Sequence, residues 1–144
     1  MMIRTLLLVC AFALSACAST QRTFSYGGGV SDADVMVGNQ RFQVWFHERD
    51  ATVLIMRGAP RPLGQLLAQN VTVFAQDQSP GIVWWGAAAN AVLNQMRCSA
   101  TEVTGADQMR EVSYVCDAGV DVRAEVDARR EVWRQGVVAA APAS

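Results

Sequence analysis

The residues with the clearest chemical potential lie around His47, the only histidine in the sequence. Glu48 and Asp50 follow it closely, and an imidazole that is oriented by a carboxylate can act as a general base in hydrolysis. A histidine that flanks a turn explains the same pattern. No Gly-x-Ser-x-Gly motif and no second histidine occur in the sequence to support a nucleophile or a metal site. The sequence therefore favours the interpretation that His47 flanks a turn over the interpretation that it is a general base.

Cys98 and Cys116 form a second candidate pair. Each belongs to a segment with strand character, and a hairpin folded about Asp107 would place the two cysteines directly opposite each other. In an oxidising compartment, thiols at that distance form a disulfide. A reactive thiol activated by His47 is the less favoured alternative, because a nucleophilic cysteine must stay reduced.

Two further patterns are incomplete versions of ligand sites. Asp32 and Asp34 are spaced like the first calcium ligands of an EF-hand loop, but the later ligands and the closing glutamate are missing. Residues 27–29 are glycines, yet no Lys-Ser/Thr pair and no helical pattern follow them, as a phosphate-binding loop requires. We interpret the two aspartates as part of a solvated loop. The sequence predicts no metal site and no cofactor.

The four tryptophans are the remaining candidates. Trp84, Trp85 and Trp133 have a spacing that fits core positions, whereas Trp45 falls on the strand face opposite Phe42, Val44 and Phe46. If helices cover only one face of the sheet, Trp45, His47 and Gln43 form an exposed patch. Tryptophans on a surface are typical of contacts with sugars, peptides or proteins. This patch is the predicted binding site.

Alternating and helical hydrophobic periods predict the elements that position these residues. Strands are expected at 41–47, 52–57, 98–104 and 111–116, with a weaker one at 24–30. Helices are expected at 63–75, from Ser79-Pro80 to about Arg97, and at 121–135. A strand remains an alternative for parts of the first and third of these helices. The predicted fold is α+β, with a small antiparallel sheet of two hairpins and two to three helices packed mainly on one face.

Length and charge limit the broad class of protein. A chain of 144 residues suits one domain, and its net charge of −1 argues against non-specific binding to nucleic acids, which requires a basic surface. The first segment contains one charge, Arg4, followed by an apolar run of about ten residues. Such a run gives about 15 Å of helix, half of what a bilayer core requires. The segment therefore fits an export signal better than a spanning helix or a buried N-terminal helix.

The end of that segment, Leu14-Ser15-Ala16-Cys17, resembles the lipobox of bacterial lipoproteins. The resemblance covers only the first seventeen residues. It implies that a diacylglyceryl group is attached to the Cys17 thiol and that cleavage follows Ala16. Two or three acyl chains hold a protein at a membrane essentially permanently. Ala18 follows the lipidated position, which in sorting systems of the enteric type favours the outer membrane.

The expected organisation follows from this resemblance. Residues 1–16 are a signal peptide, 17–23 a lipidated N-terminus with a short tether, 24–137 a single α+β domain and 138–144 a flexible tail. The predicted function is a non-enzymatic binding or scaffolding role in the cell envelope, with an envelope protein or a cell-wall polymer as partner. The alternative is a periplasmic hydrolase that uses His47 and the neighbouring carboxylates.

Overall fold

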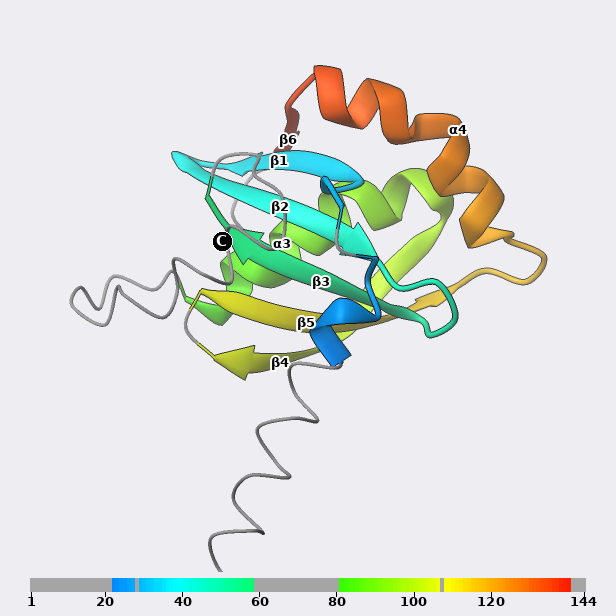
Figure 1. The fold of residues 1–144 in the computed structure, drawn as a ribbon, viewed down its shortest axis with the longest axis horizontal. Coiled ribbons are helices and arrows are strands. Elements are labelled where there is room, and N and C mark those ends of the chain that lie inside the picture. Colours follow the sequence, from blue (N-terminus) through cyan, green and yellow to red (C-terminus); the bar gives the residue numbers. More distant parts are fainter. Residues whose placement is uncertain (1–21, 28, 59–80, 107, 141–144) are drawn as a thin grey trace, which may run out of the picture.

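The structure, a computed structural model, describes residues 22–27, 29–58, 81–106 and 108–140 (Figure 1). Their elements, in chain order, are β1 (Ala33–Val37), β2 (Gln40–Phe46), β3 (Thr52–Arg57), α3 (Ile82–Leu93), the 3₁₀ helix η1 (Asn94–Met96), β4 (Cys98–Ala106), β5 (Met109–Cys116), α4 (Val122–Gln135) and β6 (Val138–Ala140). The fold is α+β, as predicted. Its sheet differs from two separate small hairpins, because within these residues it is one mixed sheet of six strands in the order β4-β5-β3-β2-β1-β6.

Both predicted hairpins are present, and β3 joins them by pairing with β5. The other two strands were not expected. β1 pairs antiparallel with β2, in the stretch that the sequence had assigned to a solvated loop. β6 pairs parallel with β1, so Val138–Ala140 belong to the sheet and not to a flexible tail. The weak strand expected at 24–30 is instead a helical turn over 22–24 followed by a hydrogen-bonded turn.

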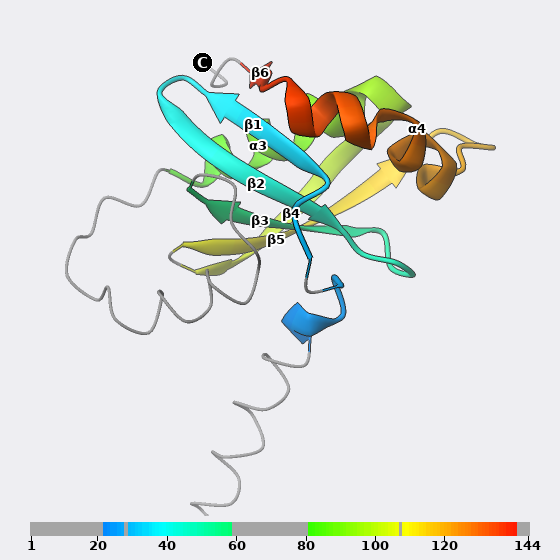
Figure 2. The same cartoon turned by 45° about the horizontal axis from the view of Figure 1, so that its top comes forward.

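The main core lies between one face of the sheet and the helices α3 and α4 (Figures 1 and 2). Alternate residues of β2 and β3 point into it, because successive side chains of a strand project to opposite faces. Phe42 packs edge-on against Trp85 with ring centroids 5.1 Å apart, and Phe46 stacks on Trp133 at 6.1 Å. Trp85 and Trp133 are therefore core residues, as their spacing indicated.

Helix α3 is the mostly buried helix that the sequence predicted before Arg97. It begins after Gly81, so the expected start at Ser79-Pro80 lies outside the described residues, as does the helix expected at 63–75. η1 extends it by one turn, and Arg97 adopts a left-handed conformation with φ 58° that directs the chain into β4.

Helix α4 confirms the predicted helix at 121–135. Asp121 caps it by accepting a hydrogen bond from the Ala124 backbone N–H at 3.1 Å. Ion pairs from Glu125 to Arg129 and from Asp127 to Arg130 form along the helix. Arg134 donates to the backbone carbonyl oxygens of Val30 and Ser31. None of the described helices combines the length and the apolar character needed to cross a bilayer.

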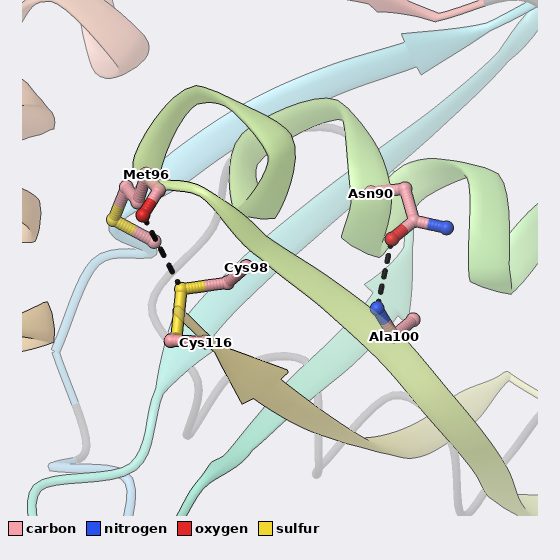
Figure 3. The surroundings of a disulfide bond; sticks show 5 residues. All are labelled: Asn90, Met96, Cys98, Ala100 and Cys116. Atoms are coloured by element: carbon pink, nitrogen blue, oxygen red, sulfur yellow. Dashed lines mark hydrogen bonds between the residues drawn. A yellow bond between two sulfur atoms is a disulfide. The ribbon is translucent and has the colours of Figure 1, made fainter. Parts of the chain in front are cut away.

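The Cys98–Cys116 disulfide is present and closes the open end of the β4–β5 hairpin (Figure 3). The two cysteines are direct partners in the ladder, as predicted. The turn is displaced by half a residue from the expected centre, and a bulge between Ala100 and Glu102 compensates for the displacement. Asn90 of α3 accepts a hydrogen bond from the Ala100 backbone N–H at 2.9 Å, which ties the helix to the bulge.

Candidate functional site

The predicted exposed patch of Trp45, His47 and Gln43 does not exist in this structure. Trp45 is 2% exposed and Gln43 is fully buried. The face of the sheet opposite the helices is covered by the N-terminal segment, residues 22–27 and 29. Tyr26 packs there with Trp45 and side chains of β3, and the Trp45 indole N–H donates to the carbonyl oxygen of Gly29 at 3.1 Å. The prediction was wrong because it assumed that no segment of the chain packs on the sheet face opposite the helices.

Gln43 belongs to a buried polar network. Its side-chain amide donates to Asp34 at 3.0 Å, and its carbonyl oxygen accepts from the Ser31 hydroxyl. The Arg41 guanidinium closes the network by donating to both oxygens of Asp34. The buried polar atoms of Asp34 and Gln43 are engaged by protein groups, so this network stabilises the packing of β1 on β2.

Asp32 and Asp34, the two aspartates with calcium-like spacing, are likewise bound by protein donors. Asp32 accepts from the Phe46 backbone N–H at 2.8 Å and from Arg130 at 2.7 Å. Their side chains are largely buried, which corrects the interpretation of a solvated loop. Among the described residues, no group of three or more histidine, cysteine, aspartate or glutamate side chains is placed to hold a metal ion.

His47 lies at the end of β2, beneath the N-terminal segment. Its Nε2 is 2.7 Å from the Ser25 hydroxyl oxygen, and its Nδ1 is 3.6 Å from a carboxylate oxygen of Asp50. Tyr26 packs edge-on against the imidazole, with ring centroids 4.8 Å apart. A serine, the histidine and a carboxylate therefore meet in space, although only His47 and Asp50 are close in sequence.

The hydrogen bonds of His47 fix the position of its proton. Nδ1 accepts from the backbone N–H groups of Arg49 at 3.2 Å and Asp50 at 2.9 Å. The neutral ring therefore carries its proton on Nε2, which donates to the Ser25 hydroxyl. A general base for that serine needs the opposite tautomer, with a free lone pair on Nε2. The three residues have the composition of a hydrolytic triad without its proton arrangement.

Arg22 holds the N-terminal segment on the sheet. Its guanidinium donates to both carboxylate oxygens of Glu111, at 3.1 and 3.0 Å, and to the Thr52 hydroxyl at 3.3 Å, and it also pairs with Asp50. A bidentate arginine–carboxylate pair is strong and geometrically specific. We call this set, Arg22 with Thr52, Asp50 and Glu111, the Arg22 clamp.

The clamp alters the titration of its carboxyls. Burial raises the pKa of Glu111, but the hydrogen bonds from Arg22 and Tyr26 together with the charge of Arg22 outweigh it, so that the pKa lies below its ordinary value. The same arginine lowers the pKa of Asp50. A carboxyl with a lowered pKa contributes stability above its ordinary pKa, 4.5 for Glu111, and loses it as the pH falls through the folded value.

This titration predicts that the clamp opens in acid. The ¹H chemical shift of the Arg22 Nε–H, which donates to Glu111, is expected to move toward the value of a solvent-exposed arginine as the pH falls through the folded pKa of Glu111, which lies below 4.5. In the Glu111→Gln variant, residue 111 has no proton to gain, so this shift should lie nearer the exposed value at pH 6 and depend less on pH. A wild-type shift that already equals that of an exposed arginine at pH 6 would contradict the described contacts.

A groove of about 490 Å³ opens beside His47 at this end of the sheet. It lies between the β2–β3 turn, the end of β5 and the first half of α4, and its floor is apolar, with Phe46, Tyr114 and Val126 buried beneath it. Its lining includes three arginines and two acidic residues. The volume is in the range of sites for small ligands or for a few side chains.

Two of these arginines, Arg49 and Arg123, have no close ion pair with a carboxylate of the described residues and can therefore bind a charged ligand. Arg123 forms one long ion pair with Asp127, at 3.8 Å, and that aspartate is also bound by Arg130 at 2.6 Å. Among the described residues, no side chain pairs with Arg49. The groove therefore combines an apolar floor with two arginines that can meet an anionic group.

Comparisons of the chain with protein-family models, with curated proteins and with solved structures give no match.

The sequence missed the residues of the N-terminal segment. Arg22 and Thr23 had been assigned to the tether, yet both pack against the sheet, and Ser25 had not been singled out. Thr23 and Tyr26, three residues apart, form the buried side of one helical turn, and that spacing is the only local signal. Their partners on β3 and β5 are distant in sequence, so no local pattern could identify them.

Proposed function

We propose that this protein is a bacterial lipoprotein of the cell envelope whose domain binds a partner without catalysing a reaction. Acyl chains on Cys17 attach it to the outer membrane, with the domain facing the periplasm, after cleavage that follows Ala16. The lipobox resemblance supports the anchor, and the disulfide agrees with an oxidising compartment. The groove supports the binding role, in place of the patch around Trp45.

The partner that best fits the groove is an extended segment of an envelope protein with an apolar side chain next to a carboxylate. The apolar floor suits a side chain, and Arg49 and Arg123 suit the carboxylate. A glycan strand fits less well, because sugars stack on exposed aromatic faces whereas Phe46 and Tyr114 are buried and pack edge-to-face on each other. The single observation that carries this proposal is the groove with its two available arginines.

Position-specific crosslinking tests the proposal. A photoreactive side chain at Val115, which lines the groove and is 58% exposed, is expected to form an adduct with an envelope protein in intact cells. The same group at Val132, which is 70% exposed and does not line the groove, is the matched control. Equal adducts from both positions, or none from Val115, would overturn the proposal. An adduct that disappears on digestion of the cell wall would identify a glycan instead.

The charge of the groove gives a mutational prediction. Arg123→Glu is expected to reduce the Val115 adduct about tenfold, because a charged hydrogen bond contributes about 1.5–3 kcal/mol and repulsion is added. Arg97→Glu, which makes the same change of charge outside the groove, should leave the adduct unchanged. The yield of adduct is measured by immunoblotting. An equal loss in both variants would indicate a non-specific effect of net charge.

A hydrolase is the second candidate, because Ser25, His47 and Asp50 meet beside the groove. The proton arrangement of His47 makes it the weaker one. An activity-based fluorophosphonate is expected to leave Ser25 unlabelled in the intact protein. Labelling of Ser25 that is lost in the His47→Gln variant would reverse the order of the two candidates.

A further inference from the structure

The N-terminal turn presents two different sides. Thr23 and Tyr26 are buried against the sheet, and the Tyr26 hydroxyl contacts the Thr52 hydroxyl at 2.8 Å. Phe24, which lies between them in the sequence, is 55% exposed. An aromatic side chain of this size would gain free energy if its surface were buried. The turn is held by the Arg22 clamp, so Phe24 projects from a fixed position on the domain.

The length of chain before this turn limits how far the domain lies from its anchor. Five residue steps separate Cys17 from Arg22. Even fully extended, they span at most about 18 Å. This step rests on the proposed lipidation of Cys17. With that anchor, the point at which the clamp holds Arg22 on the domain remains within about 18 Å of the backbone of the lipidated cysteine.

The clamp also determines which face is near the membrane. Residues 22–26 lie on one side of the sheet, and α4 lies on the other side (Figures 1 and 2). The sheet face that carries Tyr26 and Trp45 is therefore nearest the point of attachment. Val132, on the outer surface of α4, is on the far side.

We propose that the side of the domain on which the N-terminal segment covers the sheet faces the phospholipid surface and that Phe24 inserts at the level of the lipid headgroups. Aromatic side chains are favoured at the membrane–water interface, where an apolar contact is buried to about 5–10 Å. The Arg22 clamp is the device that sets this orientation, because it fixes Arg22, where the short lipidated segment meets the domain, to β5 and to the β2–β3 turn. The lipid surface thus covers an aromatic side chain that the domain itself leaves exposed.

Fluorescence quenching tests this orientation. The lipidated protein is purified from membranes and reconstituted into vesicles of phosphatidylethanolamine and phosphatidylglycerol that contain a lipid with a nitroxide headgroup. The variants Phe24→Trp and Val132→Trp each add one tryptophan at an exposed position, and wild-type emission is subtracted. The emission added by Phe24→Trp is expected to be quenched and blue-shifted. The emission added by Val132→Trp should be neither.

The same experiment separates two kinds of failure. Protein that does not co-float with the vesicles would refute the lipid anchor, and with it the proposed function. Protein that co-floats but shows equal quenching at both positions would refute the orientation alone. Adding Arg22→Gln to each variant should leave flotation intact and abolish the difference in quenching. A difference that persists without Arg22 would show that the clamp does not set the orientation.

Discussion

Cells that express the Cys17→Ala variant are expected to lose the membrane-bound mature protein almost completely. Each buried methylene of an acyl chain contributes about 0.8 kcal/mol, so two or more chains hold a domain at a bilayer essentially permanently. Without the acyl chains, the mature protein is expected to have no other membrane contact of comparable free energy. The distribution is measured by immunoblotting of the soluble and membrane fractions after a wash at high salt. Wild-type protein should be in the membrane fraction.

Two comparisons make this result decisive. Cys10→Ala alters a cysteine within the expected signal peptide and should leave the protein in the membrane fraction. Residues 18–144, exported behind a signal peptide that has no lipobox, should be entirely soluble in the periplasm. Mature protein that stays in the membrane fraction without Cys17 would show that another feature attaches it.

Removing the disulfide is expected to have the largest effect on stability. The double variant Cys98→Ser/Cys116→Ser loses a crosslink between residues separated by 18 positions. In the chain-entropy model, a loop of this size is worth about 3 kcal/mol, or a decrease in melting temperature on the order of 10 °C. Urea denaturation followed by tryptophan fluorescence measures the free energy of unfolding.

Reductant provides the control for this prediction. Dithiothreitol should destabilise the wild type to the level of the double variant and leave the variant unchanged. The denatured, unreduced mature protein should contain no free thiol, because Cys17 carries lipid and the other two cysteines are paired. Two free thiols, or a wild type that is indifferent to reductant, would contradict the disulfide.

Much of the sheet could be predicted because its hairpins are local. The strands around Trp45 alternate in hydrophobicity and flank a short polar turn, and the Cys98–Cys116 pairing follows from counting residues on either side of one turn. Strand β1 was not predicted, because the charged Asp34 interrupts its hydrophobic pattern. Asp34 is acceptable in a buried strand only because Arg41 neutralises it, and that partner is recognisable only after β1 and β2 are paired.

The candidate site was less predictable, because its parts meet through long-range contacts. Arg22 reaches Glu111 across 89 positions of sequence, and this contact buries the face on which Trp45 lies. The groove depends equally on the docking of α4 against the end of β5. Only His47 and its neighbouring carboxylates were identified in advance, and the sequence could not show that backbone N–H groups occupy the Nδ1 of His47.

The most direct test of the central claim is the mass of the N-terminal peptide of the protein recovered from cells labelled with palmitate. We expect this peptide to begin at Cys17 and to carry the label together with the mass of a diacylglyceryl group. An unlabelled peptide, or a mature chain that begins at any other residue, would contradict the account.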